Sequence, residues 1–114
     1  MTKLKDQPCE ACRPDAPKLD DEQIRALMPH VPSWQVIEVD GVKRLMRCYT
    51  FKNFADALLF TNKVGEAAES VGHHPDLLTQ WGKVTITWWT HKINGLHRSD
   101  FIMAARSDDL YGSM

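Results

Sequence analysis

Two hairpin signals on either side of a long amphipathic segment constrain the fold of this chain more than any other feature. The first is Asp40-Gly41, which separates two runs rich in β-forming residues, Trp34 to Val39 and Val42 to Phe51. An Asp-Gly pair readily adopts the positive φ angles of a two-residue hairpin turn. We therefore predict that the two runs pair as antiparallel strands.

The turn also sets the register of this hairpin, and the cross-strand neighbours that it creates are chemically complementary. The predicted pairs are Val39 with Val42, Glu38 with Lys43, Val36 with Leu45, and Trp34 with Arg47. They comprise two apolar pairs, one ionic pair and one cation–π pair. This agreement supports the turn assignment.

The segment that follows has the spacing of an amphipathic helix. Asn53 is a typical N-cap residue, and Gly72 suits the left-handed position that ends a helix. Small and apolar residues between them recur three and four positions apart, which predicts one buried stripe. The predicted stripe is Phe54, Ala57, Leu58, Thr61, Val64, Ala68 and Val71.

A second hairpin is predicted after this helix. The segment Asp76 to Gln80 enters it, Trp81-Gly82 forms the turn, and Lys83 to Thr90 leaves it on strict alternation. One face would carry Val84, Ile86 and Trp88, and the other would carry Thr85, Thr87, Trp89 and His91.

Two shorter helices complete the predicted order. Asp20 or Asp21 caps a helix from Glu22 to about Met28, and Ser99 or Asp100 starts the last helix. The order helix, hairpin, helix, hairpin, helix predicts an α+β fold of two layers, a four-stranded antiparallel sheet with three helices on one face. We assign residues 19–114 to this single domain and residues 1–18 to a flexible tail.

Composition narrows the function classes. The 14 basic and 15 acidic residues are interspersed and give a net charge of -1, which argues against nucleic acid as a ligand. No apolar run approaches the roughly 20 residues of a membrane helix, and the polar start lacks the apolar core of a signal peptide. We therefore expect a cytoplasmic protein without membrane contact.

The cysteines are Cys9, Cys12 and Cys48, an odd number that suits a reducing compartment. Cys9 and Cys12 form a C-x-x-C half-site of the kind found in zinc proteins, but no second C-x-x-C follows. The simpler interpretation is two exposed thiols in a proline-containing tail.

Ionisable side chains cluster in one part of the sequence. Four of the five histidines fall between positions 73 and 97, and a carboxylate stands on each side of them. These residues are Glu69, His73, His74, His91, His97 and Asp100. Because imidazole titrates near neutral pH, convergent histidines beside carboxylates favour proton-transfer chemistry.

Each member of this cluster also has a simpler interpretation. Glu69 suits a solvated helix surface, His91 the solvated face of a sheet, Asp100 a helix cap, and His97 an exposed position. His73 and His74 are adjacent on extended chain, where successive side chains point apart, which counts against a shared zinc ion.

The motifs as a set resemble the pterin-4a-carbinolamine dehydratase family. They are the run Glu69 to Pro75, the run Trp81 to Val84, Thr90-His91, and Gly95-Leu96 followed by Asp100. The E-x-x-x-H-H-P block with a histidine 17 residues after the second of the pair is a specific combination. The resemblance covers about Leu19 to Ala105, and the Gly95 to Arg98 loop and the two N-terminal cysteines look like the bacterial branch.

This resemblance implies dehydration of 4a-hydroxytetrahydropterin to quinonoid dihydropterin. That step recycles the pterin used by aromatic amino acid hydroxylases such as phenylalanine hydroxylase. The family fold is similar to the one predicted above, and members form homodimers or homotetramers. Some animal members also bind a homeodomain transcription factor. Pterin is the substrate, and no cofactor or metal is implied.

Site residues carry over by motif position. The resemblance implies that His73, His74 and His91 are catalytic, that Glu69 orients one of them, and that Asp100 sets the protonation or position of the site. We expect His74 and His91 to handle the leaving hydroxyl and the ring proton, with His73 binding or sharing the acid role. The expected pterin contacts are His73, Pro75, Trp89 and Trp81.

Two other classes of function stay open. One is a regulatory or dimerisation module without essential catalysis, which would bind a partner through an exposed apolar face of the last helix, Phe101, Ile102 and Ala105. The other is a zinc protein that uses His73, His91 and Cys9 or Cys12.

Overall fold

The first hairpin forms as its turn predicts. A computed structural model describes residues 4–7 and 18–114, and in it β1 (Gln35–Val39) pairs antiparallel with β2 (Val42–Thr50). Asp40 and Gly41 have φ angles of 53° and 77°, positive values typical of a type I′ turn. The predicted pairs of Val39, Glu38 and Val36 are all confirmed.

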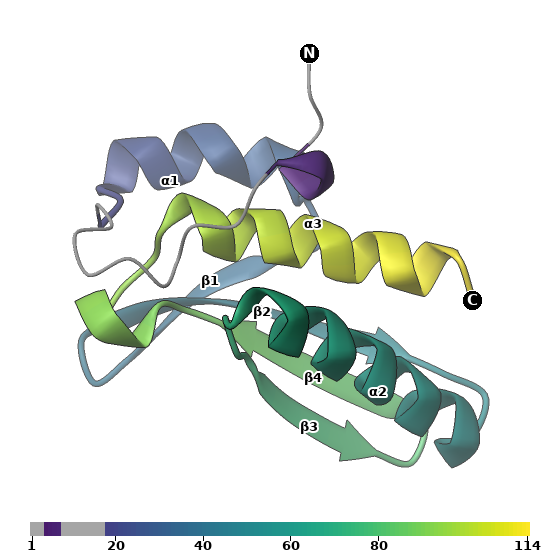
Figure 1. Ribbon diagram of the computed structural model, residues 1–114. Helices are drawn as coiled ribbons and strands as arrows, with labels where there is room; N and C mark the ends of the chain where they lie inside the picture. The colour runs from purple at the N-terminus through teal and green to yellow at the C-terminus, as the bar shows by residue number, and fades with distance from the viewer. Residues whose placement is uncertain (1–3, 8–17) are drawn as a thin grey trace.

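The second hairpin joins the first in one sheet. It consists of β3 (Asp76–Gln80) and β4 (Lys83–Trp88), and the strand order is β1-β2-β4-β3, antiparallel throughout. The helices lie together on one side of this sheet (Figure 1). The predicted two-layer α+β fold is therefore confirmed.

Strand β4 is shorter than predicted. It ends at Trp88, and Thr90 instead forms an isolated antiparallel bridge with Gly95. The short 3-10 helix η3 (His91–Ile93) fills the loop between these two residues, and Asn94 ends it in the left-handed conformation. His91 therefore lies just beyond the sheet rather than in its last strand.

Helix caps follow local sequence signals. Asp20 caps α1 (Asp21–Leu27) in a capping box with Gln23, and η2 (Met28–His30) continues it. Asn53 caps α2 (Phe54–Val71), which Gly72 ends at φ 65°. These caps satisfy backbone groups that a helix end leaves unpaired.

The last helix starts differently from the prediction. The N-cap of α3 (Arg98–Gly112) is His97, whose Nδ1 accepts a hydrogen bond from the backbone N–H of Ser99. Asp100 is the third residue of the helix, and its carboxylate accepts from the backbone N–H of His97. Histidine thus takes the place of the usual serine or threonine in a capping box, and neither Ser99 nor Asp100 is the cap.

The buried stripe of α2 is only partly the predicted one. Ala57, Val64 and Ala68 are buried, but so is Phe60, whereas Phe54 and Leu58 are exposed. The reason is aromatic packing on the sheet side. The centroid of the Phe60 ring lies 4.7 to 5.7 Å from the ring centroids of Tyr49, Phe51 and Tyr111. These distances are typical of favourable aromatic pairs.

The apolar face expected to be exposed on the last helix is part of the core. Phe101 and Ile102 are buried and Ala105 is half-buried. Exposed apolar side chains lie instead on α2, on β3 and at the turn after it, and they include Phe54, Leu58, Leu59, Leu78 and Trp81. A partner-binding face of this protein would therefore lie there.

Part of the predicted tail is docked. In η1 (Leu4–Asp6), Leu4 is buried in the core, and the Arg106 guanidinium donates to the carbonyl oxygens of Lys5 and Gln7. Residues 4–7, which the sequence assigns to the tail, thus contact α3. Cys9 and Cys12 lie outside the described residues.

None of the described helices combines the length and apolar character needed to cross a membrane.

Asp108 holds the second half of α3 against the first hairpin. Its Oδ1 accepts from Trp34 Nε1 at 3.0 Å, from Arg47 Nη1 at 2.5 Å and from the Tyr49 hydroxyl at 2.5 Å. Burial, aided by the bond to Asp108, raises the pKa of Tyr49 well above its ordinary value. The expected cation–π pair of Arg47 with Trp34 is wrong. The Arg47 guanidinium lies 4.2 Å from the ring centroid of Tyr49, and Arg47 and Trp34 both donate hydrogen bonds to Asp108 instead.

We predict that Asp108→Ala lowers the free energy of unfolding by about 2 kcal/mol, since it leaves three partly buried donors without their acceptor. Urea denaturation measures this change. Asp109→Ala is the matched control, because Asp109 makes an exposed ion pair with Lys5 and its loss should cost less than about 1 kcal/mol. Equal losses in the two variants would contradict the prediction.

Candidate functional site

Asp100 lies at the centre of the predicted site. Its side chain is 0% exposed, and its two oxygens accept hydrogen bonds from three donors. Oδ1 contacts His73 Nε2 at 2.7 Å, and Oδ2 accepts from the Thr90 hydroxyl at 2.8 Å and from the His97 backbone N–H at 2.9 Å. Because a carboxylate only accepts, the proton in the contact with His73 lies on Nε2.

The turn at Gly72 directs His73 inward. Gly72 adopts a left-handed conformation, and the His73 backbone N–H then bonds to the Ala68 carbonyl of the preceding helix. The His73 ring is buried, and its centroid lies 5.2 Å from that of Trp88 at an interplanar angle of 38°. Stacking and the bond to Asp100 thus fix the ring.

His74 points the other way and is exposed. Its Nε2 lies 3.2 Å from Glu69 Oε2, and the two side chains are 59% and 81% exposed. The sequence therefore separates the two adjacent histidines as extended chain requires, and each has its own carboxylate. Glu69 contacts His74 and not His73.

His91 is exposed and is held by an aromatic contact. Its ring centroid lies 4.3 Å from that of Trp89 at an interplanar angle of 31°. Trp89 itself is only 8% exposed, and the Arg44 guanidinium lies over its ring at 3.9 Å. Thus His91 belongs to a stack rather than to a carboxylate pair.

One carboxylate connects the chain segments that carry these histidines. Asp100 bonds to His73, which precedes His74, and to Thr90, which precedes His91. The end of α2, the loop after β4 and the start of α3 therefore meet at one point. Sequence analysis assigned no role to Thr90, and its simpler interpretation of His97 as exposed is wrong, because His97 is buried. An aspartate three residues after His97 has the spacing of a capping box.

Not every predicted ligand contact lies near this point. Trp81 is 73% exposed and lies at the turn of the β3–β4 hairpin, whereas Thr90 and His91 follow the other end of β4. Six residues of strand separate the two ends, or about 20 Å. Trp81 is therefore not at the histidine site of its own chain, whereas Pro75 is next to His74 and half-buried.

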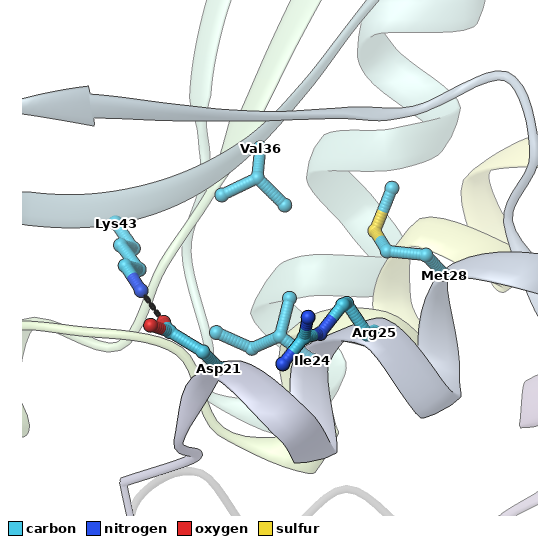
Figure 2. A pocket seen from close by; sticks show the side chains of 6 residues that line it. All are labelled: Asp21, Ile24, Arg25, Met28, Val36 and Lys43. Carbon is cyan, nitrogen blue, oxygen red and sulfur yellow. Dashed lines mark ion pairs between the residues drawn. The ribbon is translucent and has the colours of Figure 1, made fainter.

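A hollow of about 400 Å³ lies elsewhere, between α1 and the first hairpin (Figure 2). Its walls are Asp21, Ile24, Arg25, Met28, Val36 and Lys43, and an ion pair joins Lys43 to Asp21 across it. It is lined by none of the predicted site residues. The histidines and this hollow are separate features of the described surface.

Within residues 4–7 and 18–114, no group of three or more His, Cys, Asp or Glu side chains is arranged to hold a metal ion. The three histidines of the motif instead contact a buried carboxylate, an exposed carboxylate and an indole. This arrangement suits proton transfer by separate imidazoles.

Comparison with known proteins agrees with the motifs. The family model described as pterin 4 alpha carbinolamine dehydratase matches residues 17–110. A protein of Nitrosococcus oceani is 57% identical over 110 residues, which is 96% of this chain and 97% of its own. One of Marinobacter nauticus is 55% identical over 111 residues, or 97% and 100%. Their names assign both provisionally as pterin-4-alpha-carbinolamine dehydratases.

Solved structures share the fold. A transcriptional coactivator/pterin dehydratase from Brucella melitensis superposes with a TM-score of 0.75 at 28% identity, over 82% of this chain and 98% of its own. A pterin dehydratase-like protein identified as a RuBisCO assembly factor in the alpha-carboxysome gives a TM-score of 0.60 at 24% identity, over 72% and 93%. The second likeness supports the fold alone.

We predict that Asp100→Ala lowers the free energy of unfolding by about 3 kcal/mol, because it leaves buried donors in three segments without their acceptor. Thr90→Val removes one of these donors and should cost about 1 kcal/mol. Urea denaturation of both variants checks the ranking. An Asp100→Ala protein as stable as the wild type would show that the carboxylate does not hold these segments together.

Proposed function

Because this chain belongs to the pterin 4 alpha carbinolamine dehydratase family, we propose that it dehydrates 4a-hydroxytetrahydropterin to quinonoid dihydropterin. The observation that supports this most is the network around Asp100, which anchors the segments of all three motif histidines. It leaves the rings of His74 and His91 exposed to a ligand.

The chemistry needs one acid and one base. The lone pair of a ring nitrogen expels the 4a-hydroxyl group, which must gain a proton to leave as water, and a ring nitrogen must lose one. Each transfer by a positioned side chain typically contributes about 10²- to 10⁴-fold. In our proposal His74 and His91 exchange these protons, and neither a metal nor a further cofactor takes part.

The remaining residues have supporting roles in this proposal. Glu69, 3.2 Å from His74, orients that ring. His73, fixed by Asp100, binds the pterin or shares the acid role. Pro75 and Trp89 line the same pterin-binding site. The product would feed the recycling of pterin for an aromatic amino acid hydroxylase such as phenylalanine hydroxylase, in the cytoplasm.

We also propose that the protein is a homodimer or a homotetramer. Phe54, Leu58 and Leu59 lie on α2 and are each more than 40% exposed. Clustered exposed apolar side chains are typical of interaction surfaces. Leu78 and Trp81 add to the apolar surface around the second hairpin.

The same exposed residues favour a second candidate function, a partner-binding module. The similar Brucella melitensis protein is described as a transcriptional coactivator as well as a pterin dehydratase. A module of this kind would bind its partner through α2 and would not need the histidines. Loss of the histidines therefore separates the two candidates.

We predict that His74→Ala and His91→Ala each lower the rate of 4a-hydroxytetrahydropterin dehydration by about 10²- to 10⁴-fold. The reaction is followed by its ultraviolet absorbance. His30→Ala is the matched control, because His30 is exposed in η2, far along the chain from the motif, and it should keep full activity. A folded wild type that does not exceed the spontaneous rate would favour the binding module.

We predict further that Leu58→Lys with Leu59→Lys reduces the assembled state to smaller species, since buried lysines in an apolar contact are costly. Light scattering coupled to size exclusion gives the mass. Lys63→Glu on the same helix controls for a change of surface charge. An unchanged mass in the leucine variant would place the subunit contact elsewhere.

A further inference from the structure

Trp89 is only 8% exposed, and its ring contacts come from Arg44 on β2 and His91 in η3. Arg44, which contacts it, precedes Leu45 in β2, and Leu45 points into the core. Because side chains alternate along a strand, Arg44 points to the opposite face. The helices α1, α2 and α3 lie on the other side of the sheet (Figure 1). The cover of the indole therefore includes the guanidinium of Arg44 and the imidazole of His91.

The register explains why Arg44 and Trp89 meet. Leu45 pairs with Trp88 at the end of the β2–β4 ladder, so the next antiparallel position places Arg44 opposite Trp89. The guanidinium carbon lies 3.9 Å from the indole centroid, within the range of a cation–π contact. Arg44 thus holds the indole from the neighbouring strand.

Arg44 makes no competing polar contact in the described part of the chain. Its Nε is buried without a hydrogen-bond partner there, and no carboxylate pairs with its guanidinium. Arg47, two residues later, differs because it pairs with Asp108. The cation–π contact with Trp89 is therefore the interaction that the Arg44 guanidinium makes among the described residues.

His91 depends on that indole more than the other motif histidines do. His73 contacts Asp100 and His74 contacts Glu69, whereas the ring of His91 has no hydrogen-bond partner among the described residues. Its one ring contact there is Trp89. The plane of the His91 ring is thus set by stacking.

We propose that Arg44 is a positioning residue, which acts through Trp89 to fix the ring of His91. The guanidinium restricts the indole to one orientation, and the indole presents one flat surface to the imidazole. Without Arg44 the indole gains rotational freedom and His91 loses that surface. The catalytic consequence rests on the proposed function, but the positioning itself does not.

The test uses Arg44→Met, which keeps the apolar stem, and Arg44→Lys, which keeps the charge. Lys43→Met is the matched control, because it removes a neighbouring positive charge from the other face of β2. Proton NMR reads the ring signals of His91, assigned by their loss in His91→Gln. We expect Arg44→Met to move them toward the shifts of free histidine, Arg44→Lys to move them less, and Lys43→Met to leave them in place.

Kinetics supply the second readout. Arg44→Met should lower kcat by about 10-fold with a smaller change in KM, as expected when a reacting group is misplaced. In a His91→Ala background the same change should have no further effect. Arg44→Lys should recover most of the rate, which a role in folding alone would not predict.

Two results would overturn the proposal. One is an unchanged set of His91 ring signals in folded Arg44→Met, or in Arg44→Lys if the first variant does not fold. The other is an equal loss of kcat with and without His91. If the wild-type protein has no dehydratase activity, the proposed function fails, and the NMR signals alone then decide whether Arg44 positions His91.

Discussion

A buried carboxylate, Asp100, which has no lysine or arginine partner among residues 4–7 and 18–114, is the constraint on which the rest of this structure depends. Removing such a group from water costs several kcal/mol unless hydrogen bonds replace its solvation. Asp100 obtains them from His73, Thr90 and the backbone of His97. The end of α2, the loop after β4 and the start of α3 must therefore assemble together, and the motif histidines are brought to one place as a consequence.

Helix α3 is held by hydrogen bonds at two points along its length. Asp100, in its first turn, bonds to the loops after α2 and β4, and Asp108, eight residues later and about 12 Å along the axis, bonds to the first hairpin. The second aspartate gathers donors from Trp34, Arg47 and Tyr49, whereas the first gathers donors from the site. Apolar side chains such as Phe101 and Ile102 fill the core between them. The orientation of the helix is thus fixed by hydrogen bonds at two points and by packing in between.

The features that the sequence predicts well are local. The positive φ angles at Asp40 and Gly41, the cap at Asn53 and the end at Gly72 follow from the residue types themselves. The register of the first hairpin follows from its turn. These local signals are enough to predict both hairpins and the order of the helices.

What the sequence does not reveal depends on contacts between distant segments. Phe60 is the inner residue of α2 because Tyr49, Phe51 and Tyr111 surround it. Leu4 is buried because η1 packs against α3. At the site, the motif indicated the residues, but only the three-dimensional structure gives the partner of each histidine. These partners are Asp100 for His73, Glu69 for His74 and Trp89 for His91.

The difference between these three partners has a consequence for how the protein can change. A substitution at Asp100 disturbs every segment that it joins, so that position is coupled to folding. The stack of Arg44, Trp89 and His91 includes two residues of the loop after β4, but none of its three side chains is among the groups that bond to Asp100. Evolution or an engineer could therefore replace Arg44 and tune one imidazole without removing a bond to Asp100.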